Sequence, residues 1–210
     1  MLKKLLIALA AVIVVLVAYI ATRPDTFRVE RSTRIAAPPD VVFGLVNDLQ
    51  RWRDWSPWES LDPNMKRTYA GPSAGVGASE SWSGNKSVGQ GNMRITESRF
   101  PEKVGMRLEF VMPWGTSVNP VELTFKPDGA GTRVSWAMSG TNNFMLKAMS
   151  VFGDMDAMIG KDFDKGLLGL KSVAEKTAQA NAAAAAAASR APPPTVPSVP
   201  APQTPAPSGK

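Results

Sequence analysis

Three tryptophans are the first residues in this sequence whose type and spacing could do chemistry. Trp52, Trp55 and Trp58 recur at a spacing of three within the segment RWRDWSPWESLDP, and Arg51 and Arg53 lie beside them. Exposed aromatic rings next to cationic groups form stacking platforms for bases or sugars. If they are buried instead, each large ring stabilises the fold by roughly 2–3 kcal/mol and contributes to a hydrophobic wall. The spacing alone is compatible with both roles.

The chain contains no cysteine and no histidine. Disulfides, thiolate nucleophiles, Ser-His-Asp triads and the usual zinc, haem and iron–sulfur ligand sets are therefore excluded. Any catalysis would have to use Asp, Glu, Lys, Arg, Tyr or Ser side chains. We expect no cofactor.

Four aspartates near the end of the central region could suggest a metal site: Asp154, Asp156, Asp162 and Asp164. Gly160 is the seventh residue from Asp154, so the spacing departs from that of a calcium-binding loop. Residues two apart on a helix also face different directions. We interpret these aspartates as the solvated face of a helix and expect no metal site.

The positive charge of the chain lies mainly at its ends. The formal net charge is +6, and four of the 24 basic residues are Lys3, Lys4, Arg190 and Lys210. The other 20 stand against 18 acidic residues within residues 23–176, which leaves a charge of +2 there. This is far from the strongly basic surface of a nucleic-acid-binding domain. We expect no nucleic-acid partner, and the sequence identifies no protein partner.

The N-terminus combines two lysines with an apolar run. Lys3 and Lys4 precede 17 apolar residues at positions 5–21. This run is longer than a typical signal-peptide core and at the lower limit of a membrane-spanning helix. We expect residues 1–22 to be a retained transmembrane anchor, with a cleaved secretion signal as the alternative. The lysines favour a single-pass protein of the cytoplasmic (inner) membrane with an extracytoplasmic domain, whereas the arginines just beyond the run favour the opposite orientation.

The C-terminus is of low complexity. Seven alanines at positions 182–188 favour an extension of the preceding helix by propensity alone. Residues 191–210 contain eight prolines and cannot pack a core. We expect an Ala/Pro-rich disordered tail over residues 179–210.

Hydrophobic periodicity divides the central region into strands and helices. A strand is expected over residues 27–35, and Pro39 with Asp40 marks the start of an amphipathic helix. From Met65 onward, turn sequences at regular intervals separate segments that are apolar at every second residue, most clearly at 104–112, 121–125 and 134–138. This pattern is typical of an antiparallel meander with one apolar face.

A long apolar stripe follows the meander. From Leu146 to Ala174 apolar residues recur every three or four positions, which predicts a long helix that covers the apolar face of the sheet. Glycines at 153, 160, 166 and 169 each cost about 1 kcal/mol relative to alanine in a helix. They suggest a bend or a close approach to the sheet, and a simple break near Gly153 is the alternative.

The order of these elements and several separated phrases resemble a known family. The phrases are VERSTRIAAPPDVVFGLVNDLQRWRDWSPW, GVGASESWSG, GQGNMRITES, GTRVSWAMSG and MIGKDFDKGLLGLK. Over about residues 26–176 they are similar to the polyketide cyclase/dehydrase and lipid-transport group of the START-related SRPBCC superfamily. The resemblance implies an α+β helix-grip fold, in which a curved antiparallel sheet of about seven strands wraps around a long C-terminal helix. We therefore expect a helix-grip domain over residues 26–178.

The resemblance also implies a ligand cavity between sheet and helix, whose end would be closed by Trp52, Trp55 and Trp58. This favours the wall over the stacking platform. Eight of the ten methionines fall on expected strands or on the long helix, and flexible thioether chains suit a deformable apolar pocket. We expect the ligand to contact apolar walls, with one or two polar partners. The wall candidates are Met93, Leu108, Phe110, Leu123, Trp136, Met138, Met155 and Ile159, and the polar candidates are Arg31 and Tyr69.

These features predict a membrane-anchored protein that binds or transports a hydrophobic small molecule or lipid. A cyclase or dehydrase acting on an aromatic polyketide-like substrate is the alternative from another class. It would need proton-moving groups inside the cavity, and no inward-facing Asp, Glu, Lys or Tyr stands out on the apolar parity of the strands. A structural envelope module whose cavity is filled by its own side chains is the third interpretation.

Overall fold

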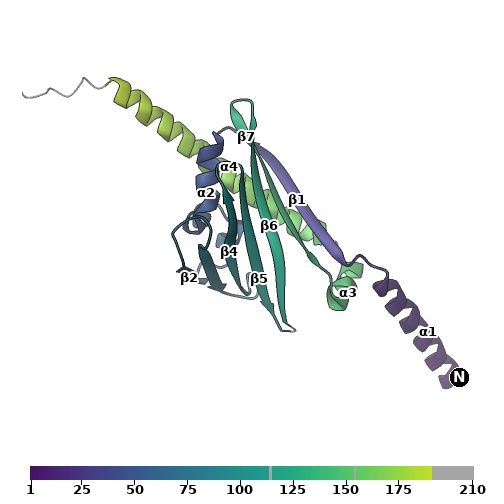
Figure 1. Cartoon of the computed structure of the whole chain (residues 1–210). Helices are drawn as coiled ribbons and strands as arrows, with labels where there is room; N and C mark the ends of the chain where they lie inside the picture. The colour runs from purple at the N-terminus through teal and green to yellow at the C-terminus, as the bar shows by residue number, and fades with distance from the viewer. Residues whose placement is uncertain (114, 154, 191–210) are drawn as a thin grey trace, which may run out of the picture.

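The computed structural model describes residues 1–113, 115–153 and 155–190, without the side chains of Phe152 and Met155. Figure 1 shows the chain as a curved sheet backed by a long helix, with a separate N-terminal helix. The elements, in chain order, are α1 (Leu2–Ala21), β1 (Thr26–Ile35), α2 (Pro39–Asn47), the 3-10 helices η1 (Leu49–Asp54) and η2 (Pro57–Ser60), β2 (Lys66–Ala70), β3 (Ser79–Ser83), β4 (Gln90–Arg99), β5 (Lys103–Met112), β6 (Gly115–Asp128), β7 (Gly131–Thr141), α3 (Phe144–Phe152) and α4 (Met155–Arg190).

The seven strands form one antiparallel sheet, as the sequence predicted. Their order is β1-β7-β6-β5-β4-β3-β2, so that β2 to β7 form a meander and β1 joins its far edge. The pairing of β4 with β5 shifts register between Ile95 and Glu97. Such an irregularity increases the local twist of a strand pair, and it contributes to the curvature of the sheet around the helices.

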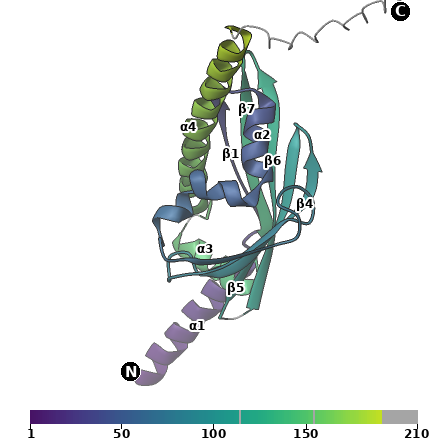
Figure 2. The ribbon, with the colours of Figure 1, turned by 90° about the vertical axis from the view of Figure 1, so that its left-hand side faces the viewer.

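Helices α2 and α4 cover the same face of the sheet (Figure 2). Pro39 begins α2 and Asp40 lies in its first turn, as expected from the sequence. One side of α2 is buried, and α4 contributes a stripe at a spacing of three or four. Both stripes join the core formed by the inward residues of the strands. The buried residues of the two helices are Val42, Phe43, Leu45, Val46, Phe163, Leu167, Leu170 and Ala174.

The apolar stripe predicted as one long helix is divided into α3 and α4 at Gly153. Asn143 caps α3, because its side chain accepts a hydrogen bond from the Leu146 backbone N–H at 2.9 Å. Gly153 ends α3 in an extended conformation. The break that the sequence left as an alternative is therefore present, and the apolar periodicity continues across it.

Two glycines of α4 allow this helix to lie against its neighbours. A Cβ atom at Gly166 would lie 2.7 Å from the Trp136 ring, and one at Gly169 would overlap the backbone of Trp55. Any side chain at these positions would push α4 away from the sheet and from η1. The close approach suggested by the sequence is thus a property of this part of α4.

Helix α1 and the last turns of α4 extend away from the domain in Figure 1. Among the described residues, α1 alone has the length and composition to cross a membrane, with a mean hydropathy of 2.7. At the other end α4 continues to Arg190 and includes the alanine run. Residues 179–190, which we assigned to a disordered tail, are therefore helical, because alanine has the highest helix propensity. The proline-rich remainder, residues 191–210, lies outside the described residues.

Candidate functional site

A cavity of about 320 Å³ lies between the sheet and helix α4. Strands β2 to β7, the two 3-10 helices and the first turns of α4 all contribute to its lining. Most of the lining side chains are apolar. They are Trp52, Trp58, Met65, Trp82, Val88, Met93, Leu108, Phe110, Val121, Trp136, Met138, Met158, Ile159 and Phe163.

Strand register explains why these apolar side chains meet. Met93 on β4 is paired with Leu108 on β5, and Val121 on β6 is paired with Met138 on β7. Directly opposed residues of an antiparallel pair point to the same face of the sheet. The two pairs therefore present four apolar side chains to α4, from which Ile159 faces them across the cavity.

The structure brings most of the predicted ligand-contacting residues together. Six of them line the cavity: Met93, Leu108, Phe110, Trp136, Met138 and Ile159. Leu123 does not, because it is fully buried in the core beside its strand partner Trp136. The side chain of Met155 lies outside the described residues. Contact of these residues with a ligand stays a prediction.

The tryptophans of the RWRDWSPW segment are packed into the fold. Trp52 and Trp55 are 5% and 4% exposed. Their indole N–H groups donate to the backbone carbonyl oxygens of Val46 and Leu45, at 2.9 and 3.2 Å. Buried rings with satisfied N–H groups form a wall and cannot act as an open stacking platform. Trp52 lines the cavity, whereas Trp55 packs behind it.

Trp136 is the centre of this aromatic wall. Its ring makes edge contacts with Trp52, Trp55 and Trp58, with centroid separations between 5.6 and 5.9 Å. Phe163 of α4 stacks on it at 4.4 Å with an interplanar angle of 10°. The Trp136 indole N–H is buried and has no hydrogen-bond partner among the described residues. The fold therefore leaves this buried donor unused.

A charged group that the sequence analysis missed lies at the cavity. Arg67 on β2 donates through Nε to Glu80 Oε1 at 2.6 Å, and through a terminal nitrogen to Glu59 on η2. All three residues line the cavity. The Arg67 and Glu80 side chains are 13% and 9% exposed, and that of Glu59 is 26% exposed. The expectation that no inward-facing acid lies on the strands is therefore wrong.

Electrostatics at Glu80 are dominated by burial. Desolvation raises the pKa of the Glu80 carboxyl above its ordinary value, and the nearby Arg67 guanidinium offsets part of that rise. Two carboxylates share one cation, so this part of the cavity is acidic overall. Asp162 of α4 also lines the cavity and adds to its acidity. In the segment SESWS, Glu80 and Trp82 are two residues apart and therefore share one face of the strand. This signal is weak, because the strand is short and most of its residues are polar, so that it shows no apolar periodicity.

The two predicted polar partners are placed differently. Tyr69 lies opposite Glu80 in the β2–β3 pair, and burial raises the pKa of its hydroxyl. That hydroxyl is buried without a hydrogen-bond partner among the described residues, but Tyr69 does not line the cavity. Arg31 does not line it either, and binds α4 through Asp156 at 2.8 Å and Asp164 at 3.5 Å.

Two of the aspartates interpreted as a solvated helix face, Asp156 and Asp164, are exposed and also pair with Arg31, whereas Asp154 lies outside the described residues. Strand β1 is paired with β7 in unbroken register, so Arg31 keeps the inward parity of Val29 and no bulge turns it outward. Its hydrogen bonds hold the pKa of Asp156 below the ordinary range. Asp156 and Asp164 attach α4 to the edge of the sheet.

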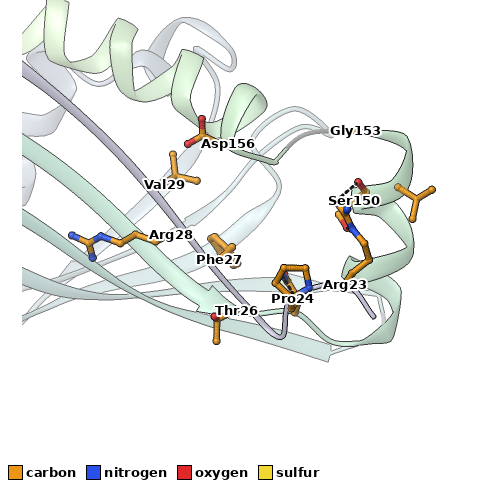
Figure 3. Close-up of a pocket in the computed structure, with 11 residues that line it drawn as sticks. Arg23, Pro24, Thr26, Phe27, Arg28, Val29, Ser150, Gly153 and Asp156 are labelled. Carbon is orange, nitrogen blue, oxygen red and sulfur yellow. Dashed lines mark hydrogen bonds between the residues drawn. The ribbon is translucent and has the colours of Figure 1, made fainter. Parts of the chain in front are cut away.

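A second hollow, of about 580 Å³, lies beside the edge strand β1 and helix α3 (Figure 3). It is bounded by the start of β1, helix α3 and the break at Gly153. Arg23 crosses it to donate to the Ser150 hydroxyl at 3.4 Å and to the Ser150 carbonyl oxygen at 3.3 Å. Although it is larger, this hollow contains none of the predicted ligand-contacting residues. The apolar cavity is the better candidate site.

A curved seven-stranded sheet, a long C-terminal helix and a cavity between them define a helix-grip protein. The chain belongs to the polyketide cyclase / dehydrase and lipid transport family, whose model matches residues 26–175. The comparison with curated proteins found no match.

Solved structures show the same fold at low sequence identity. Protein CV1439 from Chromobacterium violaceum is 17% identical, with a TM-score of 0.52, and the match covers 73% of this chain and 99% of that one. Protein SA2116 from Staphylococcus aureus is 13% identical, with a TM-score of 0.54 and coverages of 74% and 97%. The Aha1 dimer from Colwellia psychrerythraea is 16% identical, with a TM-score of 0.51 and coverages of 71% and 96%. At these identities the similarity concerns the fold alone.

Proposed function

We propose that this protein binds a hydrophobic small molecule or lipid in the 320 Å³ cavity while α1 holds it at a membrane. The observation that supports this most directly is the composition of the cavity lining, in which fourteen of twenty residues are apolar. Sites for small molecules are mostly apolar with a few placed polar groups. Here the polar lining residues include the ion-paired group of Glu59, Arg67 and Glu80.

Binding works by desolvation and orientation. The ligand's apolar surface leaves water for a wall of aromatic rings and thioethers, which adapt to irregular shapes. Met93, Met138 and Met158 supply the flexible part of that wall, and the cluster around Trp136 supplies the rigid part. The ligand's polar end lies toward the Arg67–Glu80 pair, where its hydrogen bonds replace those to water.

The size of the cavity limits the ligand. Pockets for small molecules span about 300–1,000 Å³, and a cavity of about 320 Å³ lies at the lower end of that range. The ligand is therefore a compact molecule or a single short chain, rather than an intact two-chain phospholipid.

Helix α1 supports attachment to a membrane. Its 20 residues span about 30 Å, since an α-helix rises 1.5 Å per residue, and this matches the thickness of a bilayer's hydrocarbon core. Nineteen of its residues are exposed, and only Ile20 is buried. Lys3 and Lys4 favour a cytoplasmic N-terminus and an extracytoplasmic domain, and the arginines just beyond α1 favour the opposite orientation.

Native mass spectrometry of the full-length protein, purified in detergent from its own host, tests this function. The expected result is a bound compact apolar molecule. Ile159→Trp, which fills the cavity, should abolish the adduct, whereas Leu168→Trp, at a position 64% exposed on the same helix, should retain it. An empty wild-type protein that also takes up no added apolar probe would overturn the proposal and favour a structural module.

One observation favours a second candidate function, of the cyclase or dehydrase type. Glu80 lines the cavity, and burial raises the pKa of its carboxyl group, which is the kind of group that can donate or accept a proton in catalysis. An enzyme of this kind would lose turnover of a polyketide-like substrate in Glu80→Gln while still binding it. A variant that binds and turns over the substrate unchanged would exclude Glu80 as its acid or base.

A further inference from the structure

Helix α3 presents three large apolar residues to the outside, whereas its two polar residues, Lys147 and Ser150, bond to neighbouring parts of the chain. Phe144, Met145 and Met149 are 54%, 50% and 50% exposed. An α-helix turns by about 100° per residue, so these three lie within an arc of about 140° around the axis of α3, and Lys147 and Ser150 lie outside that arc. On the other side Lys147 is ion-paired with Asp25 and its side chain is only 12% exposed. An ordinary surface helix has the opposite arrangement.

Helix α3 is also attached to the end of α1. The two helices are in contact, and Ile20, in the last turn of α1, is the buried residue of that helix. Arg23, two residues after α1, donates to the hydroxyl and the carbonyl oxygen of Ser150 on α3 (Figure 3). Figures 1 and 2 show α3 at the end of the domain from which α1 leaves.

We propose that α3 docks on the lipid bilayer, with Phe144, Met145 and Met149 inserted at its interface. This rests on the proposed role of α1 as a membrane span. If α1 crosses the bilayer, Arg23 lies at the level of the headgroups, and its bonds to Ser150 keep α3 at the same level. The exposed apolar face of α3 is then continuous with the lipid-facing surface of α1.

The chemistry of α3 suits an interfacial position. Interfacial helices bury an apolar face at the boundary of headgroups and acyl chains. In water the same face leaves three large apolar side chains half-exposed beside one another. The polar residues that normally face water are instead used to fasten α3 to Asp25 and Arg23. The bilayer therefore covers the side of α3 that the domain leaves open.

Docking of α3 would also bring the ligand cavity close to the membrane. Helix α4 begins directly after the break at Gly153, and its first turns carry Met158. Met158 lines the cavity and is 61% exposed. This edge of the cavity would therefore lie near the phase in which a hydrophobic ligand dissolves.

The absence of cysteine allows a direct test with the full chain. A nitroxide label at Met149→Cys is placed in vesicles of phosphatidylcholine and phosphatidylglycerol, and its accessibility to oxygen and to a water-soluble nickel complex is compared. Val12→Cys, within α1 and 63% exposed, reports the bilayer core, and Leu168→Cys, 64% exposed on α4, reports water. Phe144→Cys is a second probe of α3.

The proposal predicts that labels at 149 and 144 favour oxygen, at a depth between those of labels at 12 and 168. If both α3 labels are as aqueous as the label at 168 while the label at 12 is in the bilayer, docking is wrong and the anchor stands. If the label at 12 is aqueous as well, the membrane span fails, and docking fails with it. Dipolar broadening at 149 that disappears on dilution with unlabelled protein would show that a second copy covers α3, which also overturns the proposal.

Discussion

Arg67 and Glu80 form an ion pair with 2.6 Å between Nε and Oε1 at the wall of the apolar cavity. Arg67 binds Glu59 as well, so two carboxylates share one guanidinium. A buried charge is tolerated when it is paired and hydrogen-bonded, and becomes costly when its partner is removed. The folded state therefore depends on this arginine more than on the exposed cations of the sheet.

Replacement of Arg67 should be strongly destabilising. Arg67→Met keeps much of the apolar stem but leaves Glu59 and Glu80 without their shared cation, and we expect a loss of about 2–4 kcal/mol of unfolding free energy. Arg107→Met is the matched control, because Arg107 pairs with Glu109 at the surface with 55% of its side chain exposed. Such a pair contributes about 0–1 kcal/mol. Equal losses in the two variants, measured by denaturant unfolding, would contradict this account.

The pH dependence of stability should report the ionisation of Glu80. Burial raises the pKa of Glu80 in the folded state above its value in the unfolded chain. The contribution of this shift to the free energy of unfolding is therefore complete below the unfolded-state pKa, and it is lost as pH rises through the folded-state pKa. Glu80→Gln removes this loss. We expect the stability of Glu80→Gln relative to wild type to increase as pH rises from 4 to 8, by about 1.4 kcal/mol for each unit of the pKa shift.

The comparison requires full denaturant curves for both proteins across that range. A relative stability that falls with rising pH would mean that the ion pair with Arg67 outweighs desolvation. In that case the pKa of Glu80 in the folded protein is depressed rather than raised.

Much of the fold was predictable because it depends on periodicity. Every second residue from Val104 to Met112 is apolar, which predicts a strand with one buried face, and β5 covers that segment. The division of the last stripe into α3 and α4 was harder to predict. Both helices are amphipathic, so the pattern of apolar residues does not change at Gly153.

The cavity was predictable only in its apolar part. Met93, Leu108 and Met138 follow the alternation of their strands, so their common face could be read from the sequence. The charged group was missed because β2 and β3 have five residues each, most of them polar, and show no apolar parity. Only the pairing of the strands reveals that Arg67 and Glu80 lie on the face that bounds the cavity.

Helix α4 should not tolerate a side chain where it meets η1. A methyl group at Gly169 would overlap the Trp55 backbone, which cannot move as a flexible side chain can. We expect Gly169→Ala to lower the unfolding free energy by about 1–3 kcal/mol, although alanine is the better helix former by about 1 kcal/mol. Gly153→Ala is the control, since nothing lies within 4 Å of a Cβ there. If Gly169→Ala is stabilising, α4 does not pack as closely as described.

The last prediction distinguishes an open cavity from a filled core. Ile159 lines the cavity and is only partly buried, so Ile159→Trp has space for its larger ring and should change stability by less than about 1 kcal/mol. Leu167, two turns along α4, is 2% exposed within the close-packed core, and Leu167→Trp should cost about 3 kcal/mol or prevent folding. Denaturant unfolding of both full-length variants in detergent measures the difference. If Ile159→Trp is as damaging as Leu167→Trp, the space beside Ile159 is already filled by side chains, and the cavity cannot hold a ligand.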